Sequence, residues 1–233
     1  MYREHRPPRA HQSVVACLWE QEPEHDRTQR IIPDGCVDLI WADGLHVAGA
    51  DTGPREVALT GGRRVSGIRL RPGAAGALLG VPASEVRDSQ VGAALLWDDL
   101  ARLEQELAGA AHRRRLELLA ETVGRRAAEP DRLVAAAARA LAGQAARVAG
   151  VAADLGVSER QLHRRTLAAV GYGPKVLARV ARLRRLVAAG DASLAARAYA
   201  AGYASQAHMS DEVRRLTGLT PAGFLADAAL TAA

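Results

Sequence analysis

Three side chains in the N-terminal part of the chain have types and spacings that could support covalent chemistry. Cys36 and Asp38 alternate along an extended run, so both would lie on one face of a strand. With His46 nearby in sequence, they could form a nucleophile beside a base. No Ser/His/Asp or Cys/His spacing of a known catalytic set supports this idea, so we expect no catalytic residues and no enzyme. We favour a buried Cys36 and an Asp38 that bonds to a turn.

Cys17 and Cys36 are the only cysteines of the 233 residues. Two cysteines without a CxxC or Cys/His spacing provide neither a disulfide framework nor a metal site. We therefore expect no metal and no cofactor. A thiol sensor stays open as an alternative, but it would require exposed sulfur atoms with a low pKa.

A second group of side chains combines apolar surface with charge, as small-molecule sites do. These residues are Trp19, Asp38, Trp41, Arg69 and Arg71, and we predict that they line an effector pocket. In the competing interpretation both tryptophans belong to the core, and Arg69 pairs with Asp38.

The elements that would position these residues are short strands separated by Gly/Pro turns, which favour a small β-barrel or sandwich. Strands are expected at 13–20, 36–41, 45–50, 56–59 and 64–70, with turns at 33–35, 42–44 and 61–62.

From Pro72 the pattern becomes helical. A short helix is expected at 74–79, and a leucine stripe from Leu96 to Val123 predicts an antiparallel helix pair. The stripe either forms a dimer surface or packs on its own β-rich part. A break at 127–131 divides the chain into predicted domains 1–128 and 131–227, the second entirely helical. The predicted fold class is therefore α+β.

Charge separates the two predicted domains. Residues 131–227 contain 14 basic and 7 acidic residues, a net charge of +7, whereas the rest of the chain is at −2 and the whole at +5. A basic domain beside a mildly acidic one suggests a polyanion as partner of the basic domain.

The basic domain contains a duplicated unit. Residues 148–156 align with 194–202 at an offset of 46, and each stretch is a short helix that ends in glycine. Beyond the turn the offset is 47, which matches Ser158 with Ser205 as helix N-caps. Each unit therefore predicts a helix-turn-helix, whose second helix can enter the major groove of DNA. Pro174 is expected to open a long helix that separates the two units.

Further residues of the two units fit one known family. They are Gly156-Val157-Ser158-x-Arg160-x-Leu162-x-Arg164, Gly171-x-Gly173-Pro174, Ala200-x-Gly202-Tyr203-x-Ser205-Gln206-x-His208-Met209-Ser210 and Gly218-x-Thr220-Pro221-x-x-Phe224. Over residues 131–227 the chain resembles the AraC/XylS family of bacterial transcription regulators. The stretches 33–38 and 71–74 resemble, more loosely, a β-rich sensor domain found in one branch of that family.

The resemblance implies seven helices, two recognition helices in the major groove, and an N-terminal domain that binds an effector, dimerises, or both. By position it implies the base-reading residues Arg160, Gln161, His163, Arg164, Gln206, Ala207, Ser210 and Asp211. Candidates for phosphate contacts are Ser158, Ser205, Arg165, Lys175, Arg179, Arg182, Arg214 and Arg215.

The sequence departs from the family at several positions. Thr166 and Val213 stand where a bulky aromatic residue is usual, so we expect weaker packing there. Asp211 replaces a common arginine, and Glu212 beside it adds a second acid. Because carboxylates repel phosphate, the second unit is expected to contribute less DNA affinity than the first.

The expected partners are double-stranded promoter DNA, RNA polymerase, a small-molecule effector and a second copy of the chain. The polar start of the chain and the lack of an apolar run of ~20 residues predict a cytoplasmic protein with no membrane partner. The expected function is a sequence-specific transcription regulator. The alternatives are a thiol- or electrophile-responsive regulator and a DNA-repair-type methyl acceptor that uses Cys36.

Overall fold

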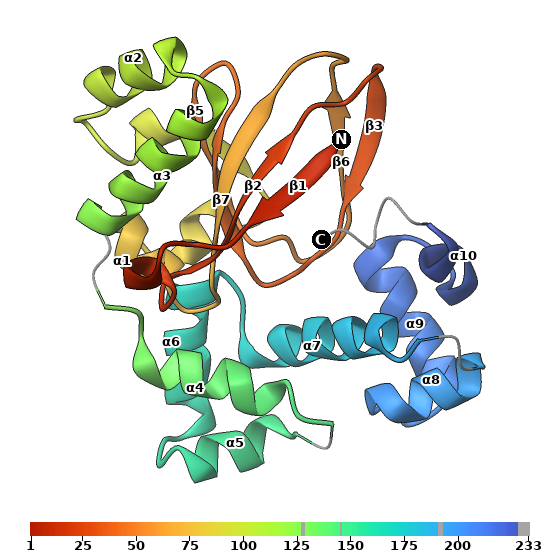
Figure 1. The fold of residues 1–233 in the computed structure, drawn as a ribbon. Helices are drawn as coiled ribbons and strands as arrows, with labels where there is room; N and C mark the ends of the chain where they lie inside the picture. Colours follow the sequence, from red (N-terminus) through yellow and green to blue (C-terminus); the bar gives the residue numbers. More distant parts are fainter. Residues whose placement is uncertain (127–128, 145, 191–192, 228–233) are drawn as a thin grey trace.

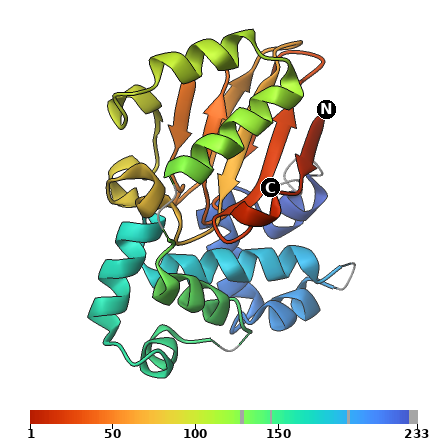
Figure 2. The ribbon, with the colours of Figure 1, turned by 60° about the vertical axis from the view of Figure 1, so that its left-hand side comes forward.

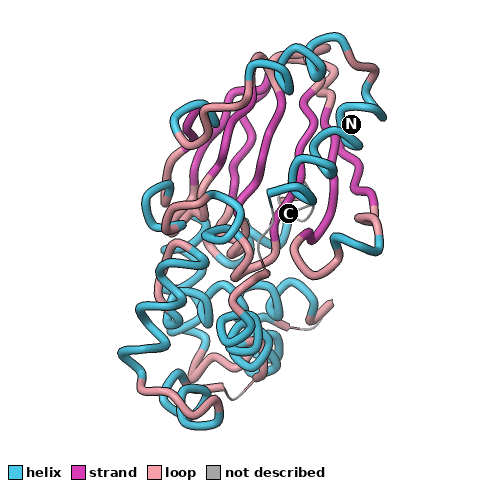
Figure 3. Tube along the Cα trace, turned by 90° about the vertical axis from the view of Figure 1, so that its left-hand side faces the viewer, coloured by secondary structure: helices cyan, strands magenta, loops and turns pink. Residues whose placement is uncertain are grey.

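The computed structural model describes residues 1–126, 129–144, 146–190 and 193–227. A β-rich N-terminal part is followed by a helical C-terminal part. Figure 3 shows the β-rich part in the upper half of the view and the helical part in the lower half. This arrangement confirms the expected α+β class. None of the helices in these ranges combines the length and hydrophobicity that a bilayer crossing requires.

The strands form two antiparallel sheets that do not close into a barrel (Figure 1). Six strands pair in the order β1-β2-β7-β4-β5-β8, and β3 pairs with β6 in a separate ribbon. The strands are β1 (Tyr2–His5), β2 (Val15–Gln21), β3 (Arg27–Ile31), β4 (Val37–Trp41), β5 (Leu45–Ala48), β6 (Arg55–Leu59), β7 (Val65–Leu70) and β8 (Gln90–Gly92). The turn at 61–62 therefore joins strands of different sheets.

One face of the six-stranded sheet is covered by helices α2 (Ala101–Gly109) and α3 (His112–Arg126), as Figure 2 shows. The leucine stripe supplies the contact, with Leu107 and Leu119 fully buried. Of the two interpretations of this stripe, packing on its own sheet holds. The stripe is thus part of the hydrophobic core that includes the sheet.

Three 3-10 turns and one short helix join these elements. They are η1 (Arg9–His11), α1 (Ala75–Leu79), η2 (Ala83–Val86) and η3 (Ala93–Leu95).

Seven helices follow residue 131 in the described ranges. They are α4 (Arg132–Leu141), α5 (Val148–Asp154), α6 (Glu159–Val170), α7 (Pro174–Ala188), α8 (Leu194–Ala201), α9 (Gln206–Thr217) and α10 (Pro221–Ala226). The pairs α5–α6 and α8–α9 are the two predicted units, and Pro174 is the first residue of the helix between them.

The two units join the β-rich part differently. Helix α6 packs on α1 and η2 so closely that a β-carbon on Gly76 would lie 2.6 Å from the Ala168 carbonyl oxygen. One hydrophobic core therefore runs from the sheet through the first unit. The second unit has its own hydrophobic core. Ile32, the residue that follows β3, is part of this core. The predicted boundary at 127–131 lies partly outside the described residues and does not divide the larger core.

Candidate nucleic-acid interface and ligand cavity

Helix α6 begins at a complete capping box. The Ser158 side chain accepts from the Gln161 amide at 3.2 Å, and Gln161 Oε1 accepts from the Ser158 amide at 2.9 Å. Gly156, at φ +67°, makes the left-handed turn that brings the chain from α5 to this cap. The cap thus satisfies orphan amides at the helix start and fixes its direction.

Buried and exposed residues divide α6 into two faces. Leu162 and Thr166 are fully buried, and the Thr166 hydroxyl donates to the Leu162 carbonyl at 2.8 Å. Thr166 is therefore buried, at one of the two positions where we expected weaker packing. Arg160, His163 and Arg164 lie exposed, and within the described part of the chain neither arginine forms an ion pair.

Arg160 and His163 line a shallow surface hollow together with Lys175 at the start of α7. Gln161 is exposed as well, but its side-chain oxygen is committed to the cap. Base reading by Gln161 would thus have to use its amide nitrogen or open the cap.

Helix α9 is built like α6, with a serine N-cap and one buried face. Ser205 is its N-cap and accepts from the His208 amide at 3.1 Å, while Met209 and Val213 are fully buried. The fully buried Val213 is the second position where weaker packing was expected.

The predicted base-reading residues of α9 are mostly exposed. Gln206, Ala207 and Asp211 lie at the surface, and Ser210 is half-buried. The Ser210 hydroxyl donates to the Gln206 carbonyl at 2.9 Å, so its hydrogen is used within the helix.

Glu212 corrects one expectation. Its side chain is 8% exposed and accepts two hydrogen bonds from Arg182, at 2.7 and 3.0 Å. Arg179 and His208 lie at 3.4 and 3.2 Å from the same carboxylate. Burial would raise its pKa, but the bonds from Arg182 and the charge of His208 outweigh burial and hold the pKa below the usual value. Glu212 therefore faces the protein interior, where it cannot repel phosphate.

The predicted phosphate ligands fall into two groups. Arg165 binds both carboxylate oxygens of Asp131, the N-cap of α4, and Arg179 and Arg182 are held by Glu212. Arg179 and Arg182 are thus held within the domain, whereas Arg165 is paired but remains exposed. The remaining candidates, Ser158, Ser205, Lys175, Arg214 and Arg215, are all exposed.

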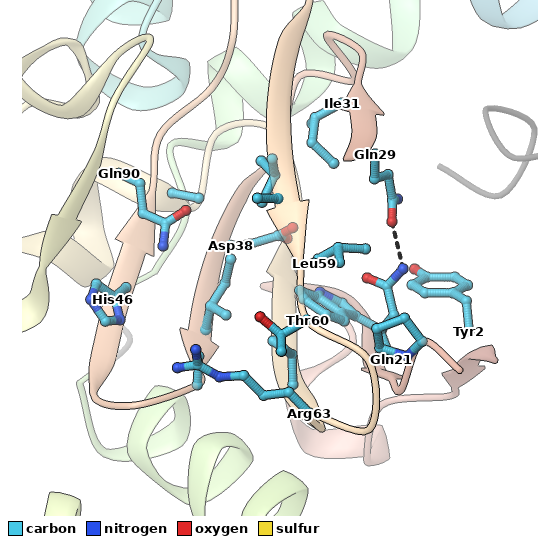
Figure 4. A pocket seen from close by; sticks show the side chains of 18 of the residues that line it. Tyr2, Gln21, Gln29, Ile31, Asp38, His46, Leu59, Thr60, Arg63 and Gln90 are labelled. Carbon is cyan, nitrogen blue, oxygen red and sulfur yellow. Dashed lines mark hydrogen bonds between the residues drawn. The ribbon is translucent and has the colours of Figure 1, made fainter. Parts of the chain in front are cut away.

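A cavity of about 520 Å³ lies between the six-stranded sheet and the β3–β6 ribbon (Figure 4). Its lining follows the two-residue period of the strands. The residues that follow this period are Trp19 and Gln21 of β2, Asp38 and Ile40 of β4, His46 and Ala48 of β5, Val65 and Arg69 of β7, Gln29 and Ile31 of β3, and Arg55, Val57 and Leu59 of β6. The lining also includes Tyr2, Pro23, Ala42, Asp43, Ala58, Thr60, Arg63 and Gln90. The volume is in the range of sites for small molecules.

Arg69 forms the polar floor of this cavity. Its Nε lies 3.2 Å from Asp38 Oδ1 and 3.3 Å from Asp34 Oδ2. Burial, with the nearby Asp34, raises the pKa of Asp38 to about 6 despite the charge of Arg69. The Arg69–Asp38 ion pair that we considered as the competing interpretation is thus present. Both of its members also line the cavity, so the two interpretations do not exclude each other.

Trp19 lies against strand β7 at Gly67, where a β-carbon would be 2.3 Å from the indole ring. Glycine is required here because any other residue would displace the ring from the cavity wall.

Two predicted pocket residues lie elsewhere. Trp41 is three residues from Asp38, so it points to the opposite face of β4 and is buried in the core under the helices. Arg71 lies beyond the end of β7, and its Nε donates to the Gln12 carbonyl at 2.8 Å. Neither lines the cavity. Sequence reasoning missed Tyr2, Gln29, Arg55 and Gln90. Tyr2, Gln29 and Gln90 lie on strands that were not predicted, and Arg55 lies on β6, which was assigned to a different sheet partner.

The two cysteines are poor candidates for thiol chemistry. Both are buried, at 9% and 7% exposure for Cys17 and Cys36. Burial raises the pKa of Cys17 to about 12 and that of Cys36 well above its usual value. Because the thiolate is the reactive form, this environment opposes both the thiol-sensor and the methyl-acceptor alternatives.

Comparisons with known families assign both parts of the chain. Residues 151–227 match the family described as a helix-turn-helix domain, and residues 3–92 match a family described as a domain of unknown function (DUF6597). No curated protein matches the chain in sequence.

The chain is also similar to solved structures of ToxT from Vibrio cholerae. ToxT bound to (E)-4-(8-methylnaphthalen-1-yl)but-3-enoic acid is 12% identical at a TM-score of 0.48, covering 96% of this chain and 98% of that one. ToxT with bound unsaturated fatty acid is 11% identical at a TM-score of 0.42, covering 91% and 94%.

Proposed function

We propose that this chain, whose residues 151–227 match a helix-turn-helix domain family, is a sequence-specific DNA-binding transcription regulator of the AraC type under small-molecule control. The observation that carries the proposal is the pair of similarly built, serine-capped helices α6 and α9 at opposite ends of α7 (Figure 1). Dimerisation and contact with RNA polymerase stay predictions.

The linking helix has a length suited to this role. Its 15 residues span roughly 22 Å, and successive major grooves on one face of DNA lie ~34 Å apart. Recognition helices that project beyond the two ends of α7 could enter neighbouring grooves. Arg160 and Arg164 are the strongest candidates for base contacts, since a free guanidinium can bond both acceptors of guanine.

The position of the cavity supports control by an effector. On β3, Gln29 and Ile31 line the cavity, whereas the intervening Arg30 donates to the Thr217 carbonyl of α9 at 3.4 Å. Ile32, the residue that follows this strand, packs into the core of the second unit. The ribbon therefore contacts the cavity and the second unit at once.

The first unit, in contrast, is fixed to the six-stranded sheet through α1 and η2. A ligand that fills the cavity would touch both the sheet and the ribbon. We propose that it sets the position of one recognition helix relative to the other.

The test is selection of bound sequences from random DNA by the full chain. We expect a preferred sequence whose affinity exceeds that of random DNA, with a salt dependence that reports phosphate contacts. Arg160→Ala and Arg164→Ala should each abolish the preference, and Gln206→Ala should only weaken it. Equal affinity for selected and random DNA would refute the proposal.

A further inference from the structure

The charges of the cavity are paired, with one exception. Arg55 binds Asp51, with its Nε 3.1 Å from Asp51 Oδ1, and Arg63 forms an ion pair with Asp43. Each of these two guanidinium groups is therefore neutralised by its own carboxylate. The Arg55–Asp51 pair is largely buried, whereas the Arg63–Asp43 pair lies at the exposed rim.

Arg69 faces two carboxylates instead of one. Asp34 and Asp38 lie within 3.3 Å of its Nε, both with side chains only 17% exposed, and Glu4 approaches its Nη1 at 3.9 Å. Asp34 lies behind this floor and outside the cavity lining, so it is the cluster around Arg69, and not the lining alone, that has more carboxylates than guanidinium groups. A largely buried carboxylate without its own counter-ion is costly unless a cation joins it.

An unpartnered donor lies in the same wall. Trp19 is 7% exposed, and its indole N–H interacts with the Asp38 carboxyl and lowers the pKa of that carboxyl, but the two groups do not reach full hydrogen-bonding geometry. A buried donor of this kind costs free energy that a ligand oxygen could recover. Tyr2 packs beside Trp19 with ring centroids 6.1 Å apart, so this part of the cavity has aromatic faces that attract cations.

The opposite side of the cavity supplies a further acceptor. His46 Nδ1 lies 3.0 Å from the Gly44 carbonyl oxygen, which can only accept, so Nδ1 carries the hydrogen. In the neutral ring Nε2 is then an acceptor. Figure 4 shows His46 and Gln90 on one side of Asp38 and the Gln21–Gln29 pair on the other.

From this arrangement we propose that the cavity binds an organic ammonium ion with an apolar body and an oxygen atom next to the amine. The ammonium lies on Asp38, the oxygen accepts from the Trp19 N–H, and the apolar body packs against Ile40, Val57 and Leu59. This proposal names the chemical class of the effector and in that sense rests on the proposed function. The binding itself requires only the cavity and does not depend on DNA.

The test is calorimetric titration of the full chain, without DNA, with four probes of one shape. Phenylethanolamine carries the amine and the oxygen, phenethylamine only the amine, phenylethanol only the oxygen, and mandelate a carboxylate. We expect phenylethanolamine to bind best and phenethylamine more weakly, with no binding of the neutral or anionic probe. Preferential binding of mandelate, equal binding of phenylethanol, or no binding of either amine would overturn the proposal.

Two variants locate the amine. Asp38→Asn should weaken amine binding about ten- to hundredfold, the range for a hydrogen bond to a charged group. Asp98→Asn, an exposed aspartate outside the cavity lining, is the matched control and should leave affinity unchanged. Trp19→Phe should remove the advantage of phenylethanolamine over phenethylamine. Equal effects of the two aspartate variants would contradict the placement, and the four-probe series in the unmodified chain decides the ligand class even if Asp38→Asn does not fold.

The two proposals fail separately. Amine binding without sequence-selective DNA binding would leave the ligand assignment intact and refute the regulator. Selective DNA binding without amine binding would refute the ligand assignment and leave the proposed regulator intact.

Discussion

Glu212 offers a sharp test of how the second unit is built. The carboxylate is 8% exposed and bound by Arg182, whose side chain is 20% exposed, with Arg179 and His208 close by. Removing one member of a buried pair costs ~3–5 kcal/mol. Because Arg182 retains some contact with water, we expect Glu212→Ala to lower the free energy of unfolding by about 2–4 kcal/mol. Glu212→Gln, which keeps an acceptor but loses the charge, should cost about 1–2 kcal/mol.

The assay is urea denaturation of both variants, with Asp211→Ala as the matched control. Asp211 is the exposed neighbour, so its loss should change stability by less than about 0.5 kcal/mol. Stability of Glu212→Ala equal to that of Asp211→Ala would refute the buried-pair reasoning.

The pH dependence of the same pair has a fixed sign. Since the folded-state pKa of Glu212 is held below the usual value of 4.5, its ionised form stabilises the fold above that pH. This contribution is lost as the pH falls through the lower folded-state pKa. The stability gap between the unmodified chain and Glu212→Gln should therefore shrink on acidification below about pH 4.5. A constant gap would contradict the assignment.

Three more outcomes follow from the geometry. Ser158→Ala removes the cap of α6 and should cost about 1 kcal/mol in urea denaturation, whereas an effect below 0.5 kcal/mol would mean that the cap is dispensable. Cys17 and Cys36 should not react with a thiol reagent at pH 8 until the chain is unfolded; rapid modification of the native protein would restore the thiol-sensor alternative. Ile32→Ala should cost about 2–4 kcal/mol and make α8–α10 more sensitive to proteolysis, and unchanged digestion would show that the ribbon does not hold the second unit.

The helical part was largely predictable because its signals are local. Glycines at helix ends, serines at N-caps and Pro174 at a helix start each act within a few residues, and the structure has all of them. The orientation of Glu212 was not predictable, because it depends on Arg182, 30 residues away in the sequence and on another helix. A charge count along α9 alone places both acids on one surface.

The cavity shows a different limit. The two-residue period of a strand could have excluded Trp41, which is an odd number of positions from Asp38. In contrast, no local pattern indicates that β6 pairs with β3 across a separate ribbon. The wall made by Gln29 and Arg55 depends on that long-range pairing, so only the half of the cavity on the six-stranded sheet was accessible to sequence reasoning.

Hydroxyl-radical footprinting on the selected DNA sequence tests the central claim most directly. Two recognition helices joined by α7 predict two protected segments about one helical turn apart on one face of the duplex. The segment under α6 should be protected more strongly, because Arg160 and Arg164 are free there while Asp211 is exposed on α9. A single protected segment would contradict the account of two DNA-reading units, and stronger protection under α9 would reverse their ranking.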